Sequence, residues 1–219
     1  MRYPYYKDYC AMYQKYMNRQ NLLDMMNLAG EDYSDRNFLD VCCGSAEAIK
    51  EANKRNARYC LGIDQETDMV PEEIIHISQP VHVAFPRLGD YTNDKKFDIV
   101  FCRQDVNYWL TPTLIYALAQ NMNKDGIFIF NTFNTKPSQY PMTKEYQIDG
   151  IEFAEISYLT GDDIVNHVQI REGYPPHVTE FRWMSERYFE LSFKGIFDFE
   201  IIRKGKTDIY VCKKIKGKS

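Results

Sequence analysis

The sequence lacks an excess of basic charge and any long apolar run, and both absences narrow the range of partners that we expect for the protein. Its 219 residues hold 27 Lys and Arg against 31 Asp and Glu, a formal net charge of −4. A protein that binds phosphate backbones needs a positive surface, so this balance argues against nucleic acid as a partner. The stretch from Met1 to Lys7 carries no apolar signal region, and no segment approaches bilayer-spanning length. We therefore expect a cytoplasmic protein with no membrane partner.

The chain also lacks the residue spacings of metal and hydrolase sites. Its six Cys form no Cys-x-x-Cys pair, which favours reduced, buried thiols over disulfides or zinc. No His, Cys and Asp cluster has metal-ligand spacing, and no Gly-x-Ser-x-Gly elbow is present. We expect no metal and no hydrolase chemistry. The pair Cys42-Cys43 suggests a reactive thiol, but the favoured interpretation is a small Cys43 buried beneath the following loop.

Apolar strands and helices alternate over residues 37–130, which is typical of a doubly wound α/β sheet. The run 97–102 is nearly continuous in apolar residues, as in a central strand covered on both faces. A length of 219 residues with 44% hydrophobic residues suits one domain with a full core. The expected strands are 37–41, 59–64, 81–85, 97–102 and 126–130, and the expected helices are 5–28, 46–56, 69–77 and 112–121.

The pattern changes after residue 135. Three extended stretches, 151–158, 163–171 and 177–184, are separated by glycine-containing turns, as in antiparallel strands. A helix over 185–194 and a hairpin over 197–213 follow. We predict a mostly parallel, seven-stranded Rossmann-like sheet that ends in an antiparallel hairpin, with an antiparallel β cap inserted after strand five. The single domain 1–219 then divides into an N-terminal helical lid (1–36), a cofactor-binding core (37–135), a cap over the acceptor (136–184) and a C-terminal helix and hairpin (185–219).

The run from Phe38 to Ala46, Phe-Leu-Asp-Val-Cys-Cys-Gly-Ser-Ala, carries most of the functional information. An apolar strand with an acid near its end leads into a small-residue turn. Small residues let the backbone approach a ligand closely, and Asp64, about 20 residues further on, ends the next apolar segment where an acid can hold ribose hydroxyls. The two segments predict a nucleoside-cofactor site on two parallel strands.

These segments, in this order, resemble the class I S-adenosylmethionine-dependent methyltransferases, of the small-molecule type. Phe38–Ala46 is similar to the family's first motif, although Cys42 and Ala46 stand where the family usually has glycine. Asp64 matches the ribose-binding acid, and Gly89-Asp90 matches the acid that faces the adenine amino group. The resemblance implies S-adenosylmethionine as the cofactor.

Further matches extend the resemblance past the fourth strand. Phe97-Asp98-Ile99-Val100 matches that strand's signature, and Asp105–Leu110 resembles the stretch after it in small-molecule members. Together these matches imply two sets of contacts. The cofactor-binding set is Asp40, Cys42, Gly44, Ser45, Ala46, Asp64, Gln65, Asp90, Tyr91, Arg103 and Gln104. The acceptor-binding set includes Asp105, Asn107 and Tyr108.

A charge argument separates this cofactor from a dinucleotide. A pyrophosphate needs a Gly-x-Gly-x-x-Gly turn at a helix N-terminus. The turn here is Cys-Cys-Gly-Ser-Ala-Glu, and Glu47 in the first helical turn would repel a pyrophosphate. A cationic sulfonium suits a site lined by Asp40, Glu47 and Asp64. The alternative is a helix-capping Glu47 and a structural Asp40.

Candidate acceptor residues lie in the cap and in the N-terminal helix. His167, Gln169 and Arg171 share one strand face because side chains alternate, so they can line an acceptor pocket with His167 as base or orienting group. A solvated sheet face is the alternative. Resemblance to amino-sugar and glycine-type N-methyltransferases implies that Tyr13, a candidate catalytic residue, and Tyr16, a candidate acceptor contact, form part of a lid. The alternative is a stripe that packs on the core.

We therefore predict methyl transfer to nitrogen or oxygen of a small-molecule acceptor. One alternative is a nucleic-acid or protein methyltransferase, which the acidic balance disfavours. Another is a catalytically silent cofactor-binding protein, favoured by Cys42 and Ala46. The sequence does not choose between nitrogen and oxygen, and it does not predict an oligomeric state.

Overall fold

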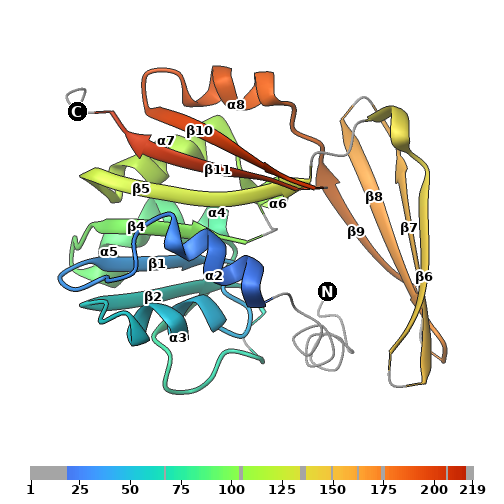
Figure 1. Cartoon of the computed structure of the whole chain (residues 1–219), viewed down its shortest axis with the longest axis horizontal. Helices are drawn as coiled ribbons and strands as arrows, with labels where there is room; N and C mark the ends of the chain where they lie inside the picture. The colour runs from blue at the N-terminus through green and yellow to red at the C-terminus, as the bar shows by residue number, and fades with distance from the viewer. Residues whose placement is uncertain are drawn as a thin grey trace.

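The computed structural model describes residues 19–66, 68–103, 106–133, 137–148, 150–161, 163–173, 176–205 and 207–215. Within these ranges the chain forms a seven-stranded sheet and a separate four-stranded sheet. Figure 1 shows the smaller sheet standing beyond the end of the larger one at which β5 finishes.

The seven-stranded sheet has the order β10-β11-β5-β4-β1-β2-β3. β1 to β5 run parallel, while β11 pairs antiparallel with β5 and with β10. This confirms the predicted fold class, with its antiparallel hairpin at one edge. The strands are β1 (Asn37–Val41), β2 (Tyr59–Asp64), β3 (His76–Ser78), β4 (Phe97–Cys102), β5 (Met122–Phe133), β10 (Phe197–Lys204) and β11 (Thr207–Lys214).

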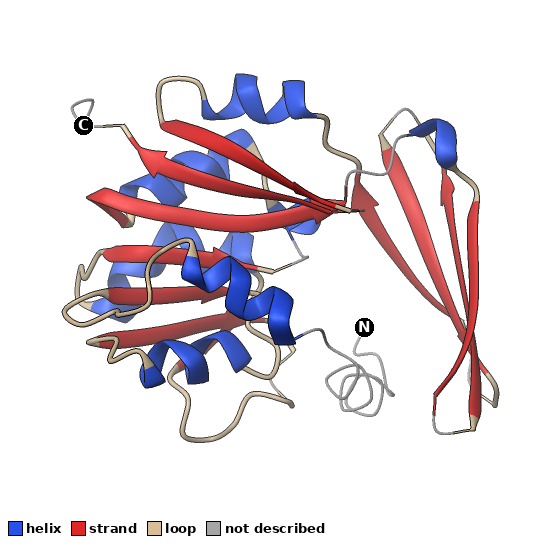
Figure 2. Ribbon diagram, viewed as in Figure 1, coloured by secondary structure: helices blue, strands red, loops and turns tan. Residues whose placement is uncertain are grey.

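Helices cover both faces of this sheet, and each face has its own apolar cluster. Figure 2 shows α2 (Arg19–Asn27) and α3 (Glu47–Lys54) on the near face. Thr111 and Ser185 cap two of the other helices by accepting backbone N–H groups. The remaining helices are α4 (Val81–Ala84), α5 (Leu88–Thr92), α6 (Val106–Trp109), α7 (Pro112–Gln120) and α8 (Glu186–Phe193), with short 3-10 turns η1 (Phe85–Arg87) and η2 (Pro137–Gln139).

Part of the aromatic content packs in one cluster between the sheet and α8. Phe130 stacks on Tyr210 with ring centroids 4.8 Å apart, and Phe189 and Phe193 close over them. All four side chains are buried, so these rings belong to the core and not to a ligand pocket.

The region between β2 and β4 corrects the prediction. The expected strand 81–85 is α4 and the start of η1. The expected helix 69–77 is wrong: residues 69–75 form turns and bends, and β3 begins at His76. In β3 only Ile77 is buried, so no apolar run marks it in the sequence. The buried residues Val81, Ala84, Phe85 and Leu88 follow helical spacing, and that signal outweighs the β-branched residues.

The smaller sheet, which we call the cap, has the order β6-β7-β8-β9 and is antiparallel throughout. Its strands are β6 (Met142–Ile148), β7 (Ile151–Leu159), β8 (Ile164–Arg171) and β9 (His177–Arg182). The prediction of three strands is wrong in number. It missed β6, whose polar residues offer little strand signal.

Candidate functional site

The turn after β1 holds three residues in the left-handed backbone region. Cys42, Gly44 and Ala46 have φ of 58°, 50° and 60°. A non-glycine residue there costs about 1–2 kcal/mol. Cys42 and Ala46 keep the backbone conformation that glycine adopts readily, and this strain marks the turn as a candidate ligand site.

Asp64, at the end of β2, ties this turn to the neighbouring strand. Its Oδ2 accepts the Gly44 N–H at 2.8 Å, and its Oδ1 accepts the Glu66 N–H at 2.8 Å. The side chain is buried, and burial raises the pKa of the carboxyl group against these backbone bonds. The predicted ribose-binding acid therefore lies beside the small-residue turn, at the carboxyl edge of the sheet.

Cys43 packs under the turn against the backbone of Gly62 in β2. A Cβ at Gly62 would meet Cys43 Sγ at 2.7 Å and Ile49 Cδ1 at 3.1 Å, so only glycine fits. Cys43 is buried, and burial followed by the nearby Asp40 and Asp64 raises the pKa of its thiol. This agrees with a packing role and argues against a reactive thiol.

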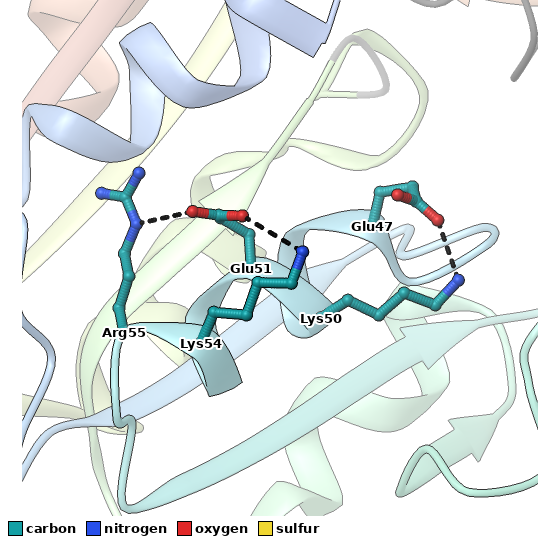
Figure 3. A network of polar contacts seen from close by, with 5 residues as sticks. All are labelled: Glu47, Lys50, Glu51, Lys54 and Arg55. Carbon is teal, nitrogen blue, oxygen red and sulfur yellow. Dashed lines mark hydrogen bonds and ion pairs between the residues drawn. The ribbon is translucent and has the colours of Figure 1, made fainter.

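Glu47 opens α3, but its charge is partly balanced. Lys50 Nζ contacts its Oε1 at 2.8 Å, and Glu51 pairs with Arg55 and Lys54 further along the helix (Figure 3). Both Glu47 and Lys50 are partly exposed, so the pair contributes little stability. Glu47 alone therefore excludes a pyrophosphate less firmly than the sequence argument held.

Asp90 does not follow β3, which corrects the premise for its adenine contact. It lies in α5, is exposed, and pairs with Arg87 at 3.2 Å. The residue that follows β3 is Gln79, whose Oε1 accepts the Tyr91 hydroxyl at 3.3 Å. Sequence reasoning did not identify Gln79 as the residue after strand three because it placed this strand five to seven residues too far along the chain, at about 81–85 and not at 76–78.

Four other predicted cofactor residues lie in a strand of the larger sheet or in the loop that follows it. Asp40 and Ser45 are buried, whereas Gln65 is exposed directly after β2 and Arg103 is partly buried directly after β4. Four predicted residues lie outside the described residues: Tyr13, Tyr16, Gln104 and Asp105.

Asn107 and Tyr108, predicted to bind the acceptor, connect the core to the cap. Asn107 Nδ2 donates to the Arg182 carbonyl of β9 at 2.9 Å, and its Oδ1 accepts the Thr132 hydroxyl of β5 at 2.7 Å. The Tyr108 ring meets Phe181 of β9 edge-on, with centroids 5.8 Å apart. The structure thus gives both residues cap contacts that the sequence did not reveal.

One face of the cap is turned to the core, and it carries the predicted polar row. Directly paired residues of an antiparallel sheet share a face, so Phe181 lies on the same face as Val165, and His167, Gln169 and Arg171 follow on that face. Because Phe181 contacts α6, we call this the inner face. The prediction that these three residues share a face is confirmed by the register.

His167 lies amid polar neighbours on the inner face. Its Nδ1 hydrogen-bonds with Ser157 Oγ at 2.8 Å. Burial lowers the pKa of its imidazole; Glu155 opposes the shift and Lys144 adds to it. A neutral ring at pH 7 follows, with Nε2 available as an acceptor or donor. Sequence reasoning missed Ser157 and Glu155, because the sequence pattern does not specify the register between β7 and β8.

No group of three or more His, Cys, Asp and Glu among the described residues is placed to hold a metal ion. Within the described ranges, no helix combines the length and apolar character needed to cross a membrane.

Comparisons with known proteins bear on the fold. No protein-family model matches the chain. A ubiquinone biosynthesis O-methyltransferase of Neisseria meningitidis serogroup C (strain 053442) is 25% identical over 116 residues, 50% of this chain and 49% of that protein. The chain thus matches about half the length of this curated relative.

Two solved structures match nearly the whole chain. An S-adenosylmethionine-dependent methyltransferase from Clostridium acetobutylicum ATCC 824 has a TM-score of 0.68 at 17% identity, covering 97% of this chain and 99% of its own. CalS10, an amino pentose methyltransferase from Micromonospora echinaspora, has a TM-score of 0.67 at 12% identity, covering 98% of each chain. With its strained turn and buried acid at the carboxyl edge of such a sheet, the chain has the fold of the class I S-adenosylmethionine-dependent methyltransferases.

Proposed function

We propose that this protein is an S-adenosylmethionine-dependent methyltransferase that acts on nitrogen or oxygen of a small molecule. One observation carries the proposal: the left-handed turn at Cys42, Gly44 and Ala46, tied by the Gly44 N–H to Asp64. This tie gives a close backbone approach and a buried acid at one point of the carboxyl edge, where α/β sheets bind ligands.

The residues present fit the cofactor. A Cβ at Gly44 would meet only Met69 Cε, at 3.8 Å, so the turn leaves space on the ligand side. The Asp64 carboxyl group accepts backbone N–H groups from Gly44, Gln65 and Glu66, and its two oxygens together offer about four acceptor positions, which leaves room for a ribose hydroxyl. Asp40 in β1, Ser45 in the turn after it, Gln65 after β2 and Arg103 after β4 would complete the site, with Gln79 after β3 and Tyr91 of α5, whose hydroxyl bonds to Gln79.

The bound cofactor supplies a methyl group that is already activated on a sulfonium. The chain's own residues then have to align the acceptor in line with that methyl group and exclude water. The inner face of the cap suits this task, because its polar row is turned toward the core.

In this proposal His167 takes a proton from the acceptor. Its Nδ1 is held by Ser157, which orients Nε2, and its lowered pKa keeps the ring neutral at pH 7. A hydroxyl acceptor needs such a base, whereas an amine that arrives neutral does not. The names of similar proteins support both outcomes, an O-methyltransferase and an amino pentose methyltransferase.

Isothermal titration with S-adenosylhomocysteine tests the cofactor site. We expect the parent to bind, Gly44→Val to lose binding sterically, and Asp64→Ala to bind more weakly by about 1–3 kcal/mol. Two matched controls lie in the cap, Gly161→Val, where a Cβ meets open space, and Asp163→Ala, an exposed acid. If Gly44→Val and Asp64→Ala bind like the controls, the site assignment is wrong.

Turnover with labelled S-adenosylmethionine tests the reaction. A panel of amino sugars, small amines and phenols, run beside tRNA and protein acceptors, separates a small-molecule enzyme from the macromolecular alternative. Binding without turnover on any member would favour the silent cofactor-binding alternative.

A further inference from the structure

One buried amide joins three elements at the border between core and cap. Asn107 of α6 is 5% exposed, donates Nδ2–H to the Arg182 carbonyl of β9 at 2.9 Å, and accepts the Thr132 hydroxyl of β5 at 2.7 Å. Thr132 is 3% exposed. Both ends of the amide are thus used inside the protein, one on the core and one on the cap.

The Arg182 carbonyl can only accept, so the amino end of the Asn107 amide faces it and Oδ1 faces Thr132. The Thr132 hydroxyl then donates to this oxygen and holds the other end of the amide on β5. Without that hydroxyl, the buried Asn107 Oδ1 loses this donor and the amide is no longer tied to β5.

We call the contacts of Asn107 with Thr132 and Arg182 the joint. The joint lies where the chain passes from the cap back into the core. β9 ends at Arg182, and Met184 is already buried in the core cluster. Next to the joint, Tyr108 of α6 packs against Phe181 of β9. Two consecutive residues of a four-residue helix therefore contact two consecutive residues of the cap.

We propose that Thr132 and Asn107 are positioning residues that fix the inner face of the cap over the carboxyl edge of the sheet. The inference rests on the proposed function. Ser157, His167 and Thr179 are paired across β7, β8 and β9 on the inner face. This cross-strand set lies two residues along the strands from Phe181, about 7 Å from the contact with α6. A shift of the joint moves this cross-strand set relative to the carboxyl edge of the sheet. A misplacement of about 1 Å can cost about 100-fold in rate.

The decisive variant is Thr132→Val, which keeps the shape of the side chain and removes the hydroxyl. Thr132→Ser restores the hydroxyl and serves as the conservative rescue. Thr143→Val on the exposed outer face of β6 is the matched control for the chemical change itself. A double variant with Asn107→Leu tests whether the two residues act as one unit.

Hydrogen exchange on the full chain, followed by mass spectrometry, measures the joint without any acceptor. In Thr132→Val we expect about tenfold faster exchange in 177–182 and 106–110, with β1 and β2 unchanged. Thr132→Ser and Thr143→Val should exchange like the parent, and the double variant should match Asn107→Leu alone. Unchanged exchange at the joint, or an equal rise over the whole core, overturns the proposal.

Kinetics distinguish positioning from mere stability. With an acceptor found in the turnover panel, Thr132→Val should lower kcat/KM for that acceptor about tenfold and leave the S-adenosylmethionine KM unchanged. An unchanged kcat/KM for the acceptor in a variant with a loosened joint also overturns the proposal. A parent that does not bind S-adenosylhomocysteine contradicts the proposed function instead, and the exchange result still decides whether the joint exists.

Discussion

The two sheets of this protein bury their strands in different ways. All five residues of β1 are buried, whereas β9 alternates between partly buried and exposed residues along its length. A strand covered on both faces leaves room for chemistry only at its ends, and a strand with one covered face can carry polar groups along that face. The core accordingly concentrates its candidate groups at Asp64 and the turn before α3, while the cap spreads His167, Gln169 and Arg171 along β8.

The largest expected effect comes from a change in the core, beneath the turn after β1. Gly62→Ala places a Cβ 2.7 Å from Cys43 Sγ beneath the turn. Overpacking of this kind should lower the free energy of unfolding by about 3 kcal/mol and abolish S-adenosylhomocysteine binding. Urea denaturation and isothermal titration measure the two effects.

The matched control is Gly161→Ala in the cap, where a Cβ meets nothing within 4 Å. It should change neither the stability nor the binding. Removing the sulfur with Cys43→Ala in the Gly62→Ala background should recover part of the stability. A tolerated Gly62→Ala would mean that the turn does not depend on this close approach.

The next effect concerns the cap alone. If His167 acts as the base, His167→Ala should lower kcat by about 100-fold and leave the affinity for S-adenosylhomocysteine unchanged. The exposed His82 on α4 offers a control, His82→Ala, with no expected change. A parent-like kcat in His167→Ala would return His167 to the solvated-face interpretation and favour a neutral amine acceptor.

The pH dependence of the parent adds a second measurement of His167. The pKa of its imidazole is lowered by burial, with Glu155 opposing and Lys144 adding, and His177 is the other titratable ring on this face. The rate should therefore fall only below a folded-state pKa that lies under the ordinary value of about 6.5. As the pH falls through this window the unfolded chain binds the proton first, so stability should fall too. His167→Ala should flatten both limbs.

The sequence predicted the strands of the core far better than the joint with the cap. The bounds of β1, β2 and β4 agree with the prediction, because continuous burial leaves a continuous apolar run. β3 has three residues at the sheet edge and leaves no such run. The misplaced strand put Asp90, which lies in α5, at the position after strand three that Gln79 holds.

Site residues divide along the same line. Asp64 follows from its place after a predicted strand, and its bond to Gly44 spans only 20 residues. The partners of Asn107 lie 25 and 75 residues away, at Thr132 and Arg182. No local sequence pattern predicts either hydrogen bond. Contacts of that kind depend on how the cap docks, which the strand pattern does not state.

A smaller effect separates the charge of Asp64 from its hydrogen bonds. Burial raises the pKa of this carboxyl group above its usual value of about 3.9, so the folded protein holds the proton to higher pH than the unfolded chain does. Stability from this group is therefore fully present below the usual value and is lost as the pH rises through the folded pKa. Asp64→Asn should reduce that loss in urea denaturation at stepped pH, because the amide does not titrate. An equal pH slope in the variant and the parent would contradict the assignment.

The smallest effect tests whether Cys42 and Ala46, which replace glycine in the turn, affect stability or cofactor affinity. Cys42→Gly and Ala46→Gly relieve left-handed strain of about 1–2 kcal/mol, while glycine adds about 0.5–1 kcal/mol of unfolded-state entropy. We expect stability to rise by at most about 1 kcal/mol, whereas Ala48→Gly in the helical part of α3 should lower it by about 1 kcal/mol. S-adenosylhomocysteine affinity should stay that of the parent, because the turn already has the backbone conformation that glycine would adopt. A clear gain in affinity at either position would show that Cys42 and Ala46 hinder the cofactor, and it would favour the silent cofactor-binding alternative over the enzyme.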